Sequence, residues 1–107
     1  MLGIIGAMDE EISIIKKDMK NIVEEKVGNI TFLKGNLYNH EVVLVESGIG
    51  KVNSSITATL LINKYNVDYV LFSGVAGSTD KRISVGDVVI GTDLVQHDMD
   101  VREFGLE

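Results

Sequence analysis

The chain has 107 residues and a mass of 11.7 kDa, with no Cys, no Pro and no Trp. This length predicts a single domain, and 45% hydrophobic with 24% charged residues is typical of a globular protein rather than a disordered one. The net charge of −6 gives no electrostatic reason to bind nucleic acid or an anionic membrane, and the lack of Cys excludes disulfides, thiolate zinc sites and Cys nucleophiles.

The first expected elements are a buried strand and an amphipathic helix. Residues 2–7 form a short apolar run, which predicts a buried strand at the very start of the chain. No basic segment precedes this run, so the start does not resemble a signal peptide, and we expect a cytoplasmic protein. Residues 9 to about 23 follow as a helix, whose apolar positions recur on one face. These positions are Ile12, Ile15, Met19, Ile22 and Val23.

A hairpin and a second helix are expected next. Residues 30–37 and 41–46 have strand patterns, and the turn-forming residues between them, His40 included, predict a hairpin. A helix over about residues 51–65 then follows, because apolar residues recur every four positions. We expect its apolar side to carry Val52, Ile56, Leu60 and Ile62.

The order of the elements indicates the fold class. Residues 68–73 and 85–92 are two further expected strands. Strands that alternate with helices predict an α/β fold with helices on the faces of a sheet, and the hairpin makes that sheet mixed. Only two helices are predicted for two faces, so the sequence looks like part of a larger fold.

Turns rich in glycine follow three of the predicted strands. They are Gly6-Ala7-Met8, Ser47-Gly48-Ile49-Gly50 and Gly74-Val75-Ala76-Gly77. Ligands of open α/β sheets bind beyond the carboxyl ends of the strands, and glycine lets a ligand approach the backbone closely. The turns therefore form either the floor of a small-molecule site or ordinary tight connections. A nucleotide site of a familiar type is excluded, because Val45 and Val52 break the P-loop pattern and Asn53 breaks the dinucleotide pattern.

Three consecutive carboxylates, Asp9, Glu10 and Glu11, open the first helix. They suit the helix dipole and the capping of the first turn, which is the usual role of such residues. Glu10 points away from the apolar face, whereas Glu11 lies on its margin and can reach the glycine-rich turns. At that position Glu11 could act as a general base on water.

A weak indication of a metal site lies near the end of the chain. His97-Asp98-Met99-Asp100 combines one imidazole with two carboxylates. The favoured interpretation is a solvated segment with a structural His, and we expect no metal.

Five segments resemble, in order and at the expected spacing, those of the 5′-methylthioadenosine/S-adenosylhomocysteine nucleosidases. They are GIIGAMDEE (3–11), SGIGKVN (47–53), GVAG (74–77), VGDVV (85–89) and HDMDVREFG (97–105). The resemblance covers the whole chain and about the first half of the family's length. It implies a nucleoside phosphorylase-like α/β/α sandwich, of which this chain forms part, a homodimer, and no metal or organic cofactor.

The resemblance also implies a reaction and a site. The reaction is hydrolysis of the bond between adenine N9 and ribose C1′, a step of methionine salvage with an oxocarbenium-like transition state. Glu11 would activate the attacking water. The implied binding residues are Ala7 and Met8 beside ribose and water, Ile49 near the 5′-thio group, Val75, Ala76 and Gly77 on ribose and adenine, and Val101 and Phe104 across the dimer interface.

Other activities remain open at this point. The family's second half supplies the acid that protonates adenine and further ribose contacts, so we expect little or no activity from these 107 residues alone. A futalosine-type hydrolase or a purine nucleoside phosphorylase would share the scaffold. A phosphorylase would need an anion site, usually made of basic residues near the glycine-rich turns. Lys51 is the nearest candidate in sequence and Gly6-Ala7-Met8 has no basic residue, which favours water over phosphate as the nucleophile. A third alternative is a non-catalytic fragment that self-associates through exposed apolar faces.

Overall fold

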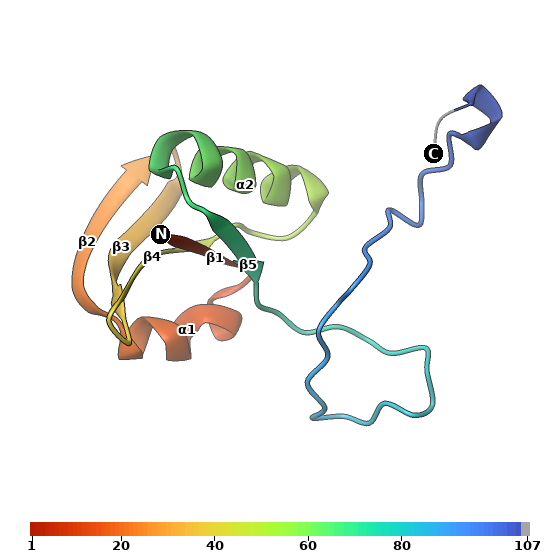
Figure 1. Cartoon of the computed structure of the whole chain (residues 1–107), viewed down its shortest axis with the longest axis horizontal. Coiled ribbons are helices and arrows are strands. Elements are labelled where there is room, and N and C mark those ends of the chain that lie inside the picture. Colours follow the sequence, from red (N-terminus) through yellow and green to blue (C-terminus); the bar gives the residue numbers. More distant parts are fainter. Residues whose placement is uncertain (106–107) are drawn as a thin grey trace. The chain divides into compact units, whose positions relative to one another are not determined.

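The computed structural model describes residues 1–105 and divides into two units, Met1–Ala76 and a second one from Gly77 onward. The first unit is a five-stranded sheet in the order β2-β3-β4-β1-β5, with one helix on each face (Figure 1). The elements are β1 (Leu2–Gly6), α1 (Asp9–Asp18), β2 (Lys20–Val27), β3 (Ile30–Leu37), β4 (His40–Glu46), α2 (Lys51–Tyr65) and β5 (Tyr69–Phe72). β1 runs parallel to β4 and β5, whereas β3 is antiparallel to both of its neighbours, so the predicted mixed α/β sheet is confirmed.

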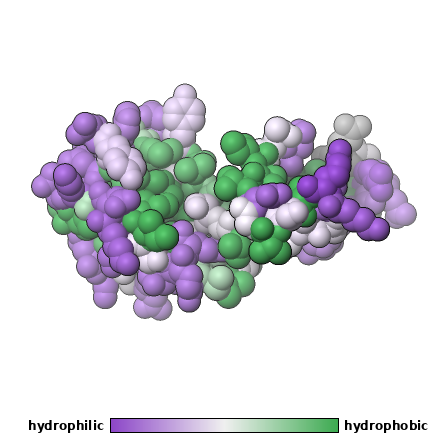
Figure 2. Space-filling model, turned by 90° about the horizontal axis from the view of Figure 1, so that it is seen from below, coloured by the Kyte–Doolittle hydropathy of each residue, from purple (hydrophilic) through white to green (hydrophobic). Residues whose placement is uncertain are grey.

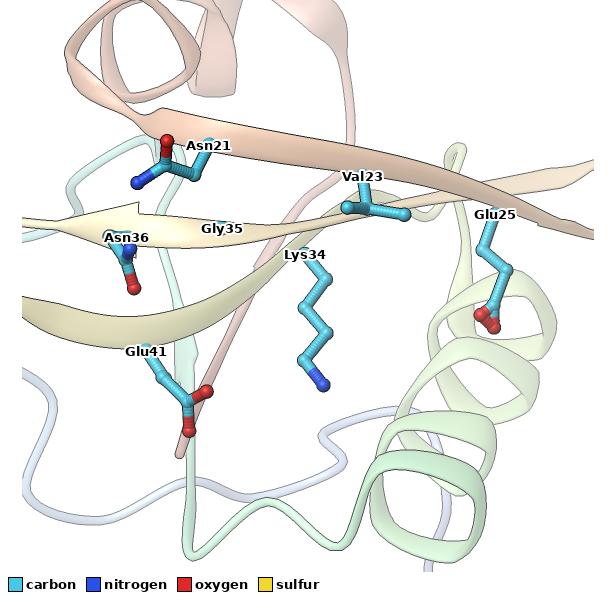
Figure 3. Close-up of a pocket in the computed structure, with 7 residues that line it drawn as sticks. All are labelled: Asn21, Val23, Glu25, Lys34, Gly35, Asn36 and Glu41. Carbon is cyan, nitrogen blue, oxygen red and sulfur yellow. The ribbon is translucent and has the colours of Figure 1, made fainter.

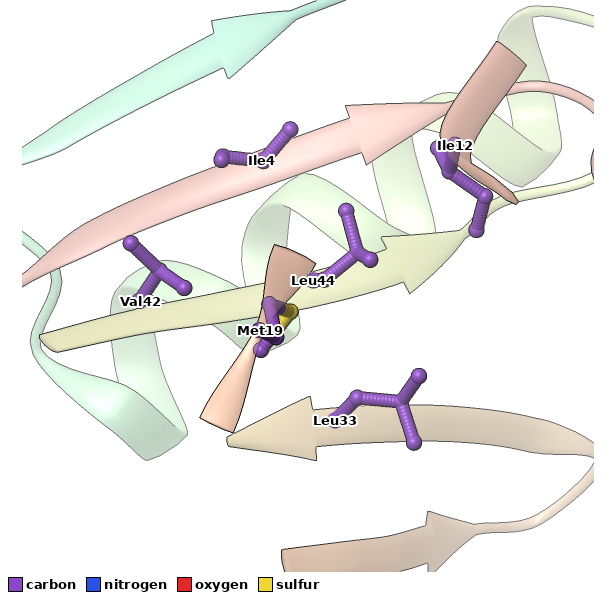
Figure 4. Close-up of a cluster of buried hydrophobic side chains, with 6 residues drawn as sticks. All are labelled: Ile4, Ile12, Met19, Leu33, Val42 and Leu44. Carbon is purple, nitrogen blue, oxygen red and sulfur yellow. The ribbon is translucent and has the colours of Figure 1, made fainter. Parts of the chain in front are cut away.

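The core has two halves, because successive side chains of a strand point to opposite faces of the sheet. On the α1 face, Ile4 of β1 and Leu44 of β4 pack against Ile12 and Met19 (Figure 4). On the α2 face, Ile5 and its neighbours pack against Leu61, whose side chain is fully buried. β1, predicted as a buried strand, contributes to both halves and lies between β4 and β5.

The first helix is shorter than predicted, and a strand replaces its second half. α1 ends at Asp18, and β2 takes up Lys20–Val27, pairing with β3 as an antiparallel edge strand. Asn21 has a left-handed backbone with φ of 56°, at the point where the pairing register shifts. Ile22 and Val23 are therefore exposed strand residues and not part of a helical face. Pairing with β3 satisfies the backbone groups of this segment that face β3, and helical periodicity could not reveal that partner.

Both strands of the predicted hairpin are present, and its turn is tight. Leu37 pairs with His40 across a loop of two residues, Tyr38 and Asn39, which have φ of 47° and 67°. Two positive φ values are the signature of a type I′ turn, which suits the twist of a hairpin. His40 is thus the first residue of β4 rather than a turn residue.

The second helix has the predicted bounds but a different buried side. Thr57 and Leu61 are the fully buried residues of α2, whereas Val52, Ile56 and Ile62 are 73%, 48% and 54% exposed. The predicted apolar side was therefore wrong, except at Leu60, which packs partly against the core. The helix carries apolar residues on two sides, and the sheet covers only one of them. Periodicity alone does not say which side meets the sheet.

The edge strand β5 matches the predicted strand 68–73, but no helix covers it. Both helices pack on β1 and β4, and all four side chains of Tyr69–Phe72 are exposed. Apolar side chains reach the surface in several places, and the green areas of Figure 2 show part of this surface. β5 therefore has an uncovered apolar surface on its two faces.

The second unit contains no strand over its described residues, so the predicted strand 85–92 is wrong. Up to residue 105, the regular element of this unit is a 3₁₀ turn, Arg102–Phe104. The backbone N–H and C=O groups of a strand need a neighbouring strand to bond with, and the described residues of this unit supply no such strand. Among residues 1–105 no helix is long and apolar enough to cross a membrane.

Candidate functional site

The glycine-rich turns begin at one edge of the sheet. β4, β1 and β5 are parallel neighbours, so their carboxyl ends coincide. The pairing continues one residue beyond the strands, since the Ser47 N–H donates to the Gly6 carbonyl at 2.9 Å and the Ser73 N–H to the Ile5 carbonyl at 2.9 Å. The three turns therefore start side by side, where ligands of α/β sheets bind.

Glu11 caps the start of α1. Its Oε2 accepts the N–H of Ala7 at 2.7 Å and the N–H of the N-cap residue Met8 at 3.2 Å. The Glu11 N–H in turn donates to the Met8 carbonyl at 3.0 Å. A third-position Glu that reaches back to the cap is the acidic half of a capping box. The structural role predicted for the acidic triplet is therefore real for Glu11.

Capping does not account for the other oxygen of Glu11. Its Oε1 accepts the N–H of Val75, which is 64 positions away in the sequence, at 3.1 Å. Val75 lies just beyond β5, so this carboxylate joins the ends of two parallel strands. The hydrogen bonds of Glu11 therefore join four residues: Ala7, Met8, Glu11 and Val75. All of them were predicted as site residues.

The surroundings of Glu11 keep it ionised. The N–H donors of Val75, Ala7 and Met8 lower the pKa of the carboxyl, with Val75 contributing most, and desolvation opposes them. Because the folded pKa lies below the ordinary 4.5, this group stabilises the fold above that pH and loses the effect as pH falls through the folded value. At neutral pH Glu11 is a carboxylate and can accept a proton.

Gly6 lets α1 start close to the sheet. A Cβ at this position would lie 2.3 Å from Cγ2 of Ile12 and 3.3 Å from Cβ of Glu11. The buried Ile12 therefore fixes the first turn of α1 against the end of β1. This close packing is what brings the carboxylate of Glu11 to the backbone of residues 7 and 8.

The loop after β4 lies at the same edge and carries Ile49. Gly48 and Gly50 have φ of 79° and 100°, which disfavour other residues. The side chain of Asn53 donates from Nδ2 to the Ile49 carbonyl at 2.8 Å and closes the loop. Ile49 itself is 74% exposed, so its side chain is available to a ligand. Asn53, which excluded a dinucleotide motif, thus has a structural task.

The remaining predicted residues divide between the two units. Ala76 follows Val75 and is exposed at the end of the first unit. Gly77, Val101 and Phe104 belong to the second unit, and Phe104 is 80% exposed. The structure therefore joins Ala7, Met8, Glu11 and Val75 of the first unit by hydrogen bonds.

A pocket elsewhere on the first unit contains none of the predicted residues. It has a volume of about 390 Å³ and lies on β2, β3 and the start of β4 (Figure 3). Its lining is mostly polar and consists of Asn21, Val23, Glu25, Lys34, Gly35, Asn36 and Glu41. Glu25 of this pocket lies 3.3 Å from Nζ of Lys64 and accepts a hydrogen bond from the Tyr65 hydroxyl. We interpret this pocket as a charged surface groove.

The His97–Asp100 segment does not form a metal site. Within the part of the chain that the structure describes, no group of three or more His, Asp or Glu side chains could hold a metal ion. The carboxylate of Asp100 instead binds the guanidinium of Arg102, at 2.6 Å between Oδ2 and Nη2. That ion pair lowers the pKa of Asp100.

Comparison with known proteins agrees with this geometry. A 5′-methylthioadenosine/S-adenosylhomocysteine nucleosidase of Staphylococcus saprophyticus is 45% identical over 107 residues, which are 100% of this chain and 47% of that protein. The solved nucleosidase of Colwellia psychrerythraea in complex with adenine has a TM-score of 0.95 at 40% identity, over 99% of this chain and 44% of that one. A futalosine hydrolase mutant of Helicobacter pylori has a TM-score of 0.86 at 40% identity, over 98% of this chain and 48% of that one.

The chain spans about half the length of the curated relatives it matches. The family model described as the phosphorylase superfamily matches residues 1–107. The mixed sheet, the turns gathered at its carboxyl edge and this match over the whole sequence lead to one conclusion: the chain belongs to the phosphorylase superfamily.

Proposed function

We propose that the protein hydrolyses the N-glycosidic bond of 5′-methylthioadenosine and S-adenosylhomocysteine and releases adenine. The observation that carries the proposal is the carboxylate of Glu11, which three backbone N–H groups hold at the carboxyl edge of the parallel strands. Relatives with this enzyme name at 45–47% identity support the choice of substrate.

In this reaction Glu11 is the general base. Water attacks ribose C1′ as the N9–C1′ bond breaks, and the electron pair of that bond leaves with adenine. Glu11 takes one proton from the water, and adenine takes one from a general acid. The resemblance assigns that acid to the family's second half. Ala7 and Met8 would lie beside the ribose and the water, Ile49 near the 5′-thio group, and Val75, Ala76 and Gly77 along ribose and adenine.

The geometry favours water over phosphate as the nucleophile. The backbone N–H groups of Ala7, Met8 and Val75 are donors of the kind that bind phosphate oxygens in many proteins. Here they already hold a carboxylate. A phosphate beside Glu11 would meet a like charge, whereas a neutral water would meet a base.

The test is an assay of the whole protein with methylthioadenosine in water enriched in oxygen-18. We expect adenine and free methylthioribose that carries the heavy oxygen at C1, with a rate that does not depend on added phosphate. A sugar phosphate that forms only when phosphate is present would overturn the hydrolase proposal and support a phosphorylase.

A second candidate is a nucleosidase for a nucleoside with a different 5′ group. The likeness to a futalosine hydrolase mutant favours it, since that protein is also 40% identical to this chain. The bond broken and the role of Glu11 would be the same. Ranking kcat/KM for methylthioadenosine, S-adenosylhomocysteine and futalosine decides between the two candidates.

We also propose a cytoplasmic homodimer in which Val101 and Phe104 cover the partner's 5′ pocket. The uncovered apolar side of α2, with Val52, Ile56 and Ile62, supports an interface of this kind. Light scattering should give twice the monomer mass, and Ile56→Asp should give the monomer mass without loss of helical circular dichroism. A monomeric wild-type protein would contradict the dimer.

A further inference from the structure

We propose that Gly74 is a positioning residue, whose missing side chain lets the Val75 N–H hold Glu11 in its working orientation. The inference rests on the proposed function, because it concerns the base of that reaction. Gly74 lies between the end of β5 and Val75, and the sequence singled it out only as part of a glycine-rich turn.

The side chains of Phe72 and of the base Glu11 lie close to Gly74. A Cβ at this position would lie 3.0 Å from Oε1 of Glu11 and 2.9 Å from Cε1 of Phe72. Oε1 is the oxygen that accepts the Val75 N–H at 3.1 Å. A methyl group here would therefore push the carboxylate away from the Val75 N–H, while the capping bonds to Ala7 and Met8 on Oε2 could remain.

The bond to Val75 also lowers the pKa of Glu11. It is the largest of the effects that lower the pKa of this carboxyl. The backbone at the ends of β1 and β5 offers Glu11 uncharged groups only, and Asp9 and Glu10 are exposed on its own helix turn. Loss of the Val75 bond therefore raises the pKa of Glu11. Since the base works ionised, the acid limb of the activity profile should move to higher pH.

The test compares Gly74→Ala with the wild type in the whole protein. We expect kcat for adenine release to fall, but by less than the about 10²-fold that a misplacement of about 1 Å costs, because the carboxylate must move by only a few tenths of an ångström. The acid limb of kcat/KM should move to higher pH. A titration of the Glu11 carboxyl by carbon-13 NMR should show its pKa raised in the same variant. Val75→Pro removes the N–H donor without adding a methyl at Gly74, and it should raise the Glu11 pKa too.

Gly91→Ala is the matched control. Gly91 lies in the second unit, and a Cβ added there would lie 3.9 Å from Cδ2 of Leu94, which is an ordinary contact. We therefore expect kcat and the pKa of Glu11 to stay as in the wild type. A Glu11 pKa unchanged in both Gly74→Ala and Val75→Pro would overturn the proposal. The NMR titration needs no turnover, so it tests Gly74 even if the wild type releases no adenine. A wild type that releases no adenine would refute the proposed function and leave the positioning role of Gly74 to be decided by the titration.

Discussion

Replacing Glu11 with Gln should lower kcat for adenine release by about 10²–10⁴-fold, which is the usual contribution of a general base. The amide has the size of the carboxylate, and its oxygen can still accept the N–H of Ala7 and Met8. It cannot take a proton from water. KM should change little, because the substrate contacts remain. The measurement is steady-state adenine release by the whole protein, with the melting temperature of each variant as a check on the fold.

Glu10→Gln is the matched control for this prediction. Glu10 is the preceding residue of the same helix turn and is exposed. Its replacement should leave kcat within about twofold of the wild type, since exposed surface changes away from the site have small effects. Equal losses for Glu10→Gln and Glu11→Gln would show that the charge of the helix start matters, and not a base at residue 11.

Acetate offers an independent check on the role of Glu11. Glu11→Ala removes two carbons and the two carboxylate oxygens. Acetate consists of the same heavy atoms and can fill the space they leave. We expect added acetate to restore part of the adenine release in Glu11→Ala and to have no effect on the wild type. Failure of acetate and formate to raise the rate in a folded Glu11→Ala protein would argue against a carboxylate base.

Replacing Leu61 with Ala should lower the free energy of unfolding by about 2–5 kcal/mol, the usual cost of a large cavity in a core. Leu61 of α2 is fully buried, in one cluster with Ile5 and Phe32 of the sheet. Its Cδ1 lies 3.1 Å from the position that a Cβ on Gly3 would take. The space that Leu61 leaves is bounded by strands on one side, so it cannot collapse easily. Urea unfolding followed by circular dichroism measures the loss.

Asn63→Ala is the control for Leu61→Ala. Asn63 lies in the same helix and is exposed, so its replacement should change the free energy of unfolding by about 0.5 kcal/mol or less. Similar losses for the two variants would mean that α2 is held by its exposed side, for example in a subunit interface, and not by the sheet.

Local pattern was enough for the elements that carry a clear signal of their own, whether or not their partners are close in sequence. The strand at residues 2–7, the hairpin of residues 30–46 and the bounds of α2 were all predictable, because each is marked by an apolar run or by turn residues. β2 was missed although Gly28 and Asn29 form a two-residue loop before β3, a pattern that predicts a hairpin. The segment 85–92 was the opposite error, because a β-rich composition does not supply a paired neighbour.

The chemistry of the candidate site follows from the sequence in part. By itself the sequence determined the residue types at the strand ends, an acidic first turn and three glycine-rich turns, and hence the choice of Glu11 as the candidate base. Only the tertiary structure decided which oxygen of Glu11 meets which donor. The Val75 N–H comes from 64 positions away, and β5 reaches Glu11 because it pairs in parallel with β1. Local periodicity carries no information on such pairing, since long-range contacts depend on the packing of the whole sheet.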